Sequence, residues 1–412
     1  MVRVLTTCEP EARTSSSISI SDQERLLGGG GRGPPGMREI VKIIVPRWCG
    51  GFRRSRARTL LAIGSAAGLA AGVLATSAPS ASAAETYSTP AMAVAAGNTV
   101  IAVQTQSDGL RFYWNQYGTN TWRGEQVAAD GTALSVPDVA ADGNGVIIAV
   151  QGPNQSLDFY WQTDGTSTWY EETVAGANTT YSAPRLATIG NSVGIVAQGP
   201  GNSLDYYWAA NGTSTWTPEW VGGYNTTYST PAIAADGNSA IVAAEGPSNS
   251  LEFYWQQDGT TPWHPELVAG AGTTFSDPAI TGNDGSANIA AAGPGNALDF
   301  YWQQNGTTPW NPEVISSETG SQEDPDITTM NHGSGDGVCV AQGESVSCAV
   351  NGSANWTASS PGVWFPGSDI AIAENGSSDN VAFYYCCGPK LFFDWDDSSG
   401  NWHGEIVDNN VS

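Results

Sequence analysis

The sequence predicts an all-β fold, a seven-bladed β-propeller in which each blade is a four-stranded antiparallel meander. One tryptophan recurs every 47 residues, at Trp114, Trp161, Trp208, Trp255 and Trp302. A second tryptophan keeps the same period, at Trp122, Trp169, Trp216, Trp263 and Trp310. A proline keeps it as well, at Pro90, Pro137, Pro184, Pro231, Pro278 and Pro325. Repeats of roughly 40 to 50 residues are typical of propeller blades.

Two further copies of the repeat are eroded, which brings the number of units to seven. Trp356 and the pair Trp395 and Trp402 fall where the sixth and seventh copies should lie. The units occupy residues 85–412, and each is a continuous stretch of chain. We therefore expect the ring to close without a strand exchanged between the two termini.

One unit, residues 231–270, shows how a blade is built. Four short apolar runs are separated by turn residues, the pattern of strands in a meander. The Asn-Gly or Asp-Gly at the third junction is a strong hairpin signal. The first two runs carry small side chains that suit the narrow centre of the ring, whereas the third run is bulky. The fourth contains Pro262 and Pro265, which cannot donate to a ladder, so it is predicted to be the edge strand at the rim.

Hairpin geometry also predicts which face of a blade each aromatic residue occupies. A two-residue Asn-Gly turn would place Tyr301 opposite Trp310 on one face, with Phe300 and Trp302 on the other. Neighbouring blades cover both faces, so both faces must be apolar. Burying one aromatic side chain of about 200 Å² contributes on the order of 5 kcal/mol before entropy is subtracted. Packing between blades is therefore the default interpretation of these rings.

Residues 1–84 are predicted to be a leader outside the fold. A basic stretch at 53–58 precedes an apolar run at 60–75 and an Ala-Ser-Ala site, the order found in export signal peptides. The apolar run is too short to span a membrane. We expect the protein to be secreted to the extracellular space. A further hypothesis is that translation starts at Met37 and residues 1–36 are not translated, which N-terminal sequencing of the precursor would test.

The charge of residues 85–412 is strongly negative. Four permanent cations, Arg111, Arg123, Arg185 and Lys390, stand against 35 Asp and Glu residues, a net charge of 4 − 35 = −31. Such a surface repels phosphate and anionic lipid, so neither nucleic acid binding nor membrane insertion is expected. No cofactor is predicted.

The residue pattern of the repeats resembles that of secreted propeller lectins. The pattern S-x-P-A-x-A, a glycine-containing hairpin, L-x-F-Y-W-Q and W-x-x-E is similar to the tectonin-like and bacterial fucose-binding families, some of which have seven blades. The resemblance covers nearly all of residues 85–412. It implies non-catalytic binding of neutral sugars, in glycans on cell surfaces or in polysaccharides, at shallow pockets between neighbouring blades.

The resemblance also implies which residues bind sugar. The expected platforms are the second tryptophan of each repeat: Trp122, Trp169, Trp216, Trp263 and Trp310. The expected acceptors are the carboxylates three positions on: Glu125, Glu172, Glu219, Glu266 and Glu313, with Glu405 in the last unit. The sixth unit has Ser359 instead, which puts that pocket in question. Packing for the tryptophans and a solvated edge charge for the glutamates are the alternative interpretations.

Two other classes of function stay open. A propeller scaffold for a protein partner would expose one broad patch that breaks the seven-fold pattern. An enzyme needs one catalytic constellation, such as Asp142 and Asp236 meeting at the axis to cleave a glycosidic bond. The three histidines have no ligand or triad spacing. The acidic segment 394–405 approaches calcium-loop spacing but lacks its glycine, so no metal is predicted.

Four cysteines follow the leader, all in the last two units. Cys339 and Cys348 are placed symmetrically about a turn, as disulfide partners across a hairpin would be, with Cys348 in the position of the missing third-strand tryptophan. Cys386 and Cys387 are adjacent and could form a vicinal ring. Export makes disulfides plausible, although four cysteines allow three pairings.

Overall fold

The computed structural model describes residues 88–411, apart from short gaps. These gaps lie at 117–120, 144, 164–165, 258, 283–284, 305–306, 317–323, 331–334, 343–344, 352–355, 363–365, 367, 376–377, 385–388 and 398. The predicted leader, residues 1–84, lies outside the described residues. Within them there are two short 3-10 helices, Pro153–Gln155 (η1) and Pro294–Asn296 (η2), and no helix long and apolar enough to cross a membrane.

Seven four-stranded antiparallel sheets make up the fold, and each takes four consecutive strands. Blades 1 to 4 comprise β1 Ala91–Ala95, β2 Asn98–Gln104, β3 Leu110–Gln116, β4 Trp122–Ala128; β5 Asp138–Asp142, β6 Gly145–Gly152, β7 Ser156–Thr163, β8 Tyr170–Ala175; β9 Arg185–Ile189, β10 Ser192–Gln198, β11 Leu204–Ala210, β12 Thr217–Gly222; β13 Ala232–Asp236, β14 Ser239–Glu245, β15 Leu251–Gln257, β16 Thr260–Ala269. Blades 5 to 7 comprise β17 Ala279–Gly282, β18 Ala287–Ala292, β19 Leu298–Gln304, β20 Thr307–Ser316; β21 Asp326–Met330, β22 Gly335–Gln342, β23 Ser345–Asn351, β24 Trp356–Gly362; β25 Ala371–Glu374, β26 Asp379–Tyr384, β27 Leu391–Asp396, β28 Trp402–Asp408. The predicted seven-bladed propeller is confirmed.

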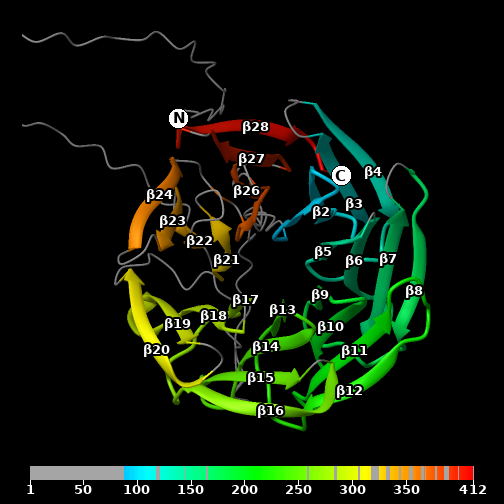
Figure 1. Cartoon of the computed structure of the whole chain (residues 1–412). Coiled ribbons are helices and arrows are strands. Elements are labelled where there is room, and N and C mark those ends of the chain that lie inside the picture. Colours follow the sequence, from blue (N-terminus) through cyan, green and yellow to red (C-terminus); the bar gives the residue numbers. More distant parts are fainter. Residues whose placement is uncertain are drawn as a thin grey trace, which may run out of the picture. The chain divides into compact units, whose positions relative to one another are not determined.

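The blades follow one another around a closed ring, with the first strand of each at the centre and the fourth at the rim (Figure 1). First strands of successive blades contact each other, and β25 of blade 7 contacts β1 of blade 1. No sheet combines strands from the two ends of the chain, so the prediction of closure without strand exchange is confirmed. Side chains between blades 7 and 1 therefore have to hold the ring shut.

The hydrophobic core is divided into seven clusters, one at each boundary between neighbouring blades in the described part of the chain. We call these boundaries seams. The second strand of a blade is buried almost throughout, as the burial of Ala240 to Ala244 in β14 shows. The third strand supplies the large rings, among them Phe300, which is 1% exposed. The fourth strand is half exposed, as expected for the rim.

The pairing of the third and fourth strands departs from the predicted register. Tyr301 lies opposite Pro312 rather than Trp310, because β20 contains two extra residues between the turn and this pair. Pro309 lies in that stretch and has no N–H to donate, so a regular ladder cannot pass through it. The predicted faces are nevertheless confirmed: Tyr301 and Trp310 pack toward blade 4, and Phe300 packs toward blade 6.

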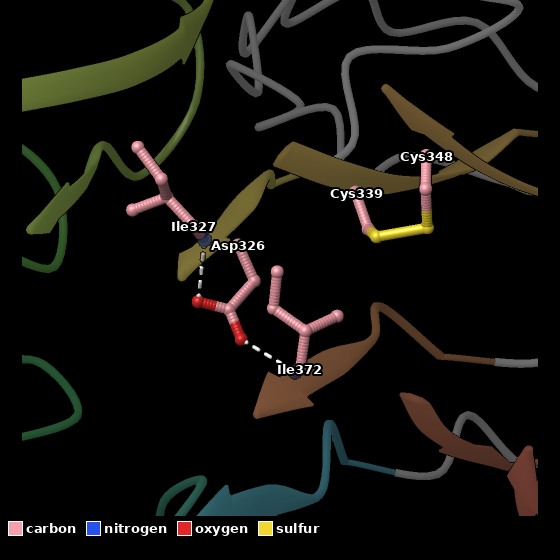
Figure 2. The surroundings of a disulfide bond; sticks show 5 residues. All are labelled: Asp326, Ile327, Cys339, Cys348 and Ile372. Carbon is pink, nitrogen blue, oxygen red and sulfur yellow. Dashed lines mark hydrogen bonds between the residues drawn. A yellow bond between two sulfur atoms is a disulfide. The ribbon is translucent and has the colours of Figure 1, made fainter. Parts of the chain in front are cut away.

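A disulfide joins β22 and β23 of blade 6, between Cys339 and Cys348 (Figure 2). This pairing was predicted from the hairpin symmetry. The predicted position of Cys348 within the repeat was wrong. Cys348 pairs with Ser359 in the strand register, and at the equivalent place in blade 5 Phe300 pairs with Glu313. The cysteine therefore replaces the phenylalanine of the repeat and not its third-strand tryptophan. The disulfide thus occupies a core position at the seam of blades 6 and 7. Cys386 and Cys387 lie outside the described residues.

Buried aspartates tie first strands together near the axis. In blade 6 the Asp326 carboxylate accepts from the backbone N–H of Ile327, at 2.9 Å, and from that of Ile372 on β25, at 2.8 Å (Figure 2). Asp138 makes the same bridge from blade 2 to blade 3, to Val139 at 3.0 Å and Leu186 at 2.7 Å. Burial raises the pKa of Asp326 to about 6, since these donors only partly offset the loss of water.

Asp394 of β27 is a buried carboxyl group without such donors. It occupies the register position that Tyr113 and Tyr301 hold in their blades, and it is 1% exposed. Neither carboxyl oxygen has a hydrogen-bond partner among the described residues. Desolvation raises the pKa of Asp394 to about 7, so this side chain is neutral in the folded protein below that pH.

We predict that Asp394→Asn removes part of the pH dependence of stability. The folded pKa of about 7 exceeds the value of about 3.9 in an unfolded chain, so the folded state binds the extra proton between these limits. The free energy of unfolding of the parent protein should therefore fall as pH rises from 4 to 7, relative to the variant, by at most about 1.4 kcal/mol per pH unit.

Denaturant unfolding of both proteins at pH 4.5, 6 and 8 measures this difference. Asp130→Asn, at an exposed loop residue, is the control and should follow the parent. Parallel profiles for the parent and Asp394→Asn would show that Asp394 is ionised or hydrated in the folded state.

Candidate functional site

The predicted sugar-binding tryptophans lie at the seams, each leaning against an aromatic ring of the preceding blade. We call them the rim tryptophans and include Trp356 of blade 6. The pairs are nearly perpendicular, with ring centroids 4.8 to 5.1 Å apart: Phe112–Trp169, Phe159–Trp216, Tyr206–Trp263, Phe253–Trp310, Phe300–Trp356 and, across the ring closure, Phe393–Trp122. Trp263 and Trp310 are buried, and the other four are half-buried. Edge-to-face contacts of this kind stabilise the seams.

Each rim tryptophan donates its indole N–H to the glutamate of the preceding blade. The Nε1–carboxylate distances range from 2.7 to 3.3 Å for Trp169–Glu125, Trp216–Glu172, Trp263–Glu219, Trp310–Glu266, Trp356–Glu313 and Trp122–Glu405. The glutamate stands directly across the strand pair from the aromatic ring that the tryptophan touches, as Phe253 does from Glu266. One rim tryptophan therefore meets a ring and a carboxylate together.

The same glutamate also binds the third-strand tryptophan of its own blade. In blades 2 to 5 the Nε1 atoms donate to Oε1 at 2.8 to 3.2 Å: Trp161–Glu172, Trp208–Glu219, Trp255–Glu266 and Trp302–Glu313. The other oxygen, Oε2, takes the rim tryptophan of the next blade. Each carboxylate is thus a clamp between two indoles from neighbouring blades. The repeat pattern predicts packing for the third-strand tryptophans and gives no sign of this bond.

An amide is a third donor at several seams. Gln162, Gln256 and Gln303 donate to the glutamates of the preceding blades at 3.0, 3.2 and 2.8 Å, and Asn115 donates to Glu405 at 3.4 Å. These residues follow the third-strand tryptophan directly in the sequence. Their recurrence at the 47-residue period was a signal that could have identified them.

The geometry separates residues that the sequence placed together. A rim tryptophan and the glutamate three positions on, such as Trp169 and Glu172, lie on opposite faces of one blade and belong to successive seams. Each seam instead combines the glutamate of one blade with the rim tryptophan of the next. The role of the predicted tryptophans and glutamates in sugar binding stays a prediction, and the indole N–H groups of these tryptophans already donate to carboxylates.

The seam that closes the ring keeps the bond from the rim tryptophan to the glutamate and adds a second bond. Trp122 donates to Glu405 at 2.7 Å, and the Tyr113 hydroxyl donates to Asp408 at 2.7 Å. Burial, followed by the bond to Asp408, raises the pKa of Tyr113, so its hydroxyl stays a donor at any physiological pH. Burial also raises the pKa of Glu405. These contacts join blades 7 and 1, which share no strand.

The seam between blades 1 and 2 departs from this pattern and contains a cavity of about 350 Å³. Here no hydrogen bond joins Trp114 Nε1 to Glu125 among the described residues, and Glu125 accepts both of its bonds, from Gln162 and Trp169, on Oε2. The guanidinium of Arg123 lies over the Trp114 ring, 4.8 Å from its centroid. The cavity is lined by Phe112, Trp114, Arg123, Glu125, Gln162, Thr166 and Ser167, among others.

Solved structures with the same fold have low sequence identity to this chain. The BP39L lectin from Burkholderia pseudomallei matches with a TM-score of 0.68 at 16% identity, over 78% of this chain and 100% of its own. This chain shares the fold of a lectin. A mutant of AofleA from Arthrobotrys oligospora matches with a TM-score of 0.50 at 15% identity, over 66% and 85% of the two chains.

A prolyl endopeptidase also matches, with a TM-score of 0.53 at 14% identity, over 78% of this chain but 49% of its own. No protein-family model matches the sequence, and no curated protein matches it. The resemblance to propeller lectins noted in the repeats is therefore supported by the fold, and at these identities the likeness concerns the fold alone.

The two aspartates that could have acted in catalysis are hydrogen-bonded to neighbouring blades. Asp142 accepts from the Asn211 amide at 2.6 Å, and Asp236 accepts from the Gly285 backbone at 2.7 Å, in each case on the next blade. In the acidic segment, Asp394 is buried in the blade while Glu405 lies at the ring closure. No group of three or more potential metal ligands is present in the described part of the chain.

We predict that Glu172→Ala destabilises the propeller, whereas Glu171→Ala does not. Glu172 accepts from Trp161 at 3.2 Å and from Trp216 at 3.1 Å, while its neighbour Glu171 is exposed. Leaving two half-buried indole N–H groups without their acceptor should cost about 2 kcal/mol or more. The midpoints of guanidinium denaturation measure the effect. Equal midpoints for the two variants would mean that water replaces the carboxylate and that the clamp contributes no stability.

Proposed function

We propose that this protein is a secreted, non-catalytic carbohydrate-binding propeller that takes neutral sugars at cavities between neighbouring blades. Its targets would be glycans on cell surfaces or in polysaccharides. The lectin-like fold supports the class of function. The export signal expected at residues 53–83 supports secretion.

The cavity between blades 1 and 2 carries the proposal. It offers both kinds of surface that a pyranose needs, aromatic walls from Phe112 and Trp114 and polar groups from Arg123, Glu125 and Gln162. A sugar presents C–H bonds to an aromatic face and hydroxyl groups to donors and acceptors. The cavity volume of about 350 Å³ lies at the lower end of the range of volumes found for small-molecule sites.

The open hydrogen-bonding groups distinguish this seam from those of blades 2 to 5. In blades 2 to 5 each third-strand tryptophan donates its indole N–H to Oε1 of the glutamate in the same blade. At the first seam Trp114 Nε1 and Glu125 Oε1 make no bond to each other among the described residues, so one donor and one acceptor are left for sugar hydroxyls. A polar ligand needs donors and acceptors that the protein does not already pair, and the missing hydrogen bond leaves one of each beside the cavity.

The non-catalytic part of the proposal rests on the partners of the axial carboxylates. Asp142 and Asp236, the pair considered for glycoside cleavage, are hydrogen-bonded to the next blades rather than directed at a common point by any contact in the described residues. The prolyl endopeptidase shares this fold over only 49% of its chain. Propellers host many functions, so that likeness by itself does not favour catalysis.

We predict that Arg123→Thr and Glu125→Gln each weaken sugar binding about tenfold or more, a change of about 1.4 kcal/mol. Threonine occupies the position of Arg123 in blade 3, at Thr217, so the fold accommodates it. A glycan array probed with the purified protein identifies the sugar, and calorimetry with that sugar compares the variants. Glu171→Gln is the exposed control. No binding to any glycan on the array would contradict the proposed function.

A further inference from the structure

Blade 3 exposes two aromatic rings at the end of its sheet remote from the rim tryptophan. Trp220 on β12 is 72% exposed, and Tyr224 in the loop that follows is 71% exposed. Both exposures are far above those of the other aromatic residues that the repeat places in the seams. Two large rings left in water on a folded protein usually mark a binding surface.

The two rings border a cavity of about 160 Å³. The rest of its lining comprises Thr179 from the loop before blade 3, Pro200, Ser203, Asp205 and Gly223. Trp220 stands directly opposite Asp205 in the pairing of β12 with β11. The exposed rings therefore form the mouth of a concave site and the buried polar residues form its interior.

Asp205 supplies an unsatisfied acceptor to this cavity. The side chain is 7% exposed, and its Oδ1 atom has no hydrogen-bond partner in the described part of the protein. Burial raises the pKa of Asp205, and Ser203 donates a hydrogen bond to the Asp205 carboxyl group. Gly199 makes room for the group, because a Cβ there would lie 2.0 Å from Oδ2. A buried acceptor without a donor is costly, and a ligand hydroxyl would remove that cost.

Only blade 3 combines these features among the blades in which the position is described. Asp158, Glu252 and Asp299 hold the position of Asp205 in blades 2, 4 and 5, but the residues opposite them are Thr173, Leu267 and Val314. The position of Tyr224 is held by Ala177 in blade 2 and Ala271 in blade 4. The acid is thus shared by blades 2 to 5, with Arg111 and Phe392 in its place in blades 1 and 7, and the two aromatic rings are an addition confined to one blade.

We infer that Trp220, Tyr224 and Asp205 form a second carbohydrate site on blade 3, separate from the cavity between blades 1 and 2. A pyranose ring would stack on the indole, with the tyrosine at its edge and a hydroxyl donating to Asp205 Oδ1. This inference rests on the proposed carbohydrate-binding function, which it extends to a second surface. Two sites on one chain would raise the affinity for a polymeric glycan above that for a single sugar.

A protein partner fits this surface less well. Protein interfaces are broad, whereas this feature is a cavity of about 160 Å³ with an acceptor inside it. At the position of Trp220, blades 4 and 5 carry single exposed aliphatic residues, Leu267 and Val314, rather than a continuation of the aromatic pair. A small ligand with C–H faces and hydroxyl groups matches both parts of the site.

The test compares Trp220→Thr, Tyr224→Ala and Asp205→Asn with the parent protein. The first two introduce the residues that blade 2 carries at the same positions, Thr173 and Ala177, so the fold tolerates them. Leu267→Thr is the matched control on blade 4, where an exposed apolar residue faces the corresponding acid. Thermal unfolding of each variant confirms that the propeller is intact.

The probes are glucose, galactose, mannose, fucose, xylose and N-acetylglucosamine with their oligosaccharides, detected by saturation-transfer NMR and calorimetry. We expect each blade 3 variant to bind sugar at the blade 3 site about tenfold or more weakly than the parent protein. The Leu267→Thr variant should bind as the parent does. Arg123→Thr should leave this class of site intact.

The possible outcomes separate the two proposals. Full binding by Trp220→Thr together with a loss in Arg123→Thr would overturn the blade 3 site and leave the proposed function standing. Loss in the blade 3 variants alone would support this site and contradict the cavity between blades 1 and 2. Absence of binding to every probe and to the glycan array would overturn both, and binding of a polypeptide abolished by Trp220→Thr would assign the surface to a protein partner.

Discussion

A carboxylate that binds two indoles at once joins each blade to the next in most of this ring. Glu219 shows the arrangement: Oε1 accepts from Trp208 of its own blade, and Oε2 accepts from Trp263 of the following blade. Hydrophobic packing between blades is non-directional and would tolerate sliding of one sheet over another. The clamp adds direction, because both donors must point at one group, and so fixes how far apart the rims of neighbouring blades can lie.

Hydrogen bonds to rim carboxylates matter most where the chain does not continue. Blades 7 and 1 are joined by no strand, and their seam depends on Trp122 and Tyr113, which donate to Glu405 and Asp408. Each of these bonds is made at the rim, while first strands meet at the centre. A ring closed in this way has contacts at both ends of its radius, so opening it would break apolar, aromatic and charged interactions together.

Function in this protein is best sought where the blades differ from one another. Residues that recur at most seams, such as Trp216 and Glu172, are hydrogen-bonded to each other and packed. The cavity of the first seam accompanies a missing bond and an added guanidinium, Arg123, and the cavity of blade 3 accompanies an added ring pair. The residues that repeat form the scaffold, whereas the positions that differ between blades leave hydrogen-bonding groups and aromatic faces open to a ligand.

The sequence alone determined the architecture, because a 47-residue period, alternation along strands and prolines on the fourth strand are local signals. It also placed Tyr301 and Trp310 on the right face and paired Cys339 with Cys348. Only the tertiary structure decided which glutamate meets which tryptophan, since residues three apart on a strand face opposite seams. It alone revealed the register shift around Pro309 and the cavities, which depend on contacts between blades that no single repeat encodes.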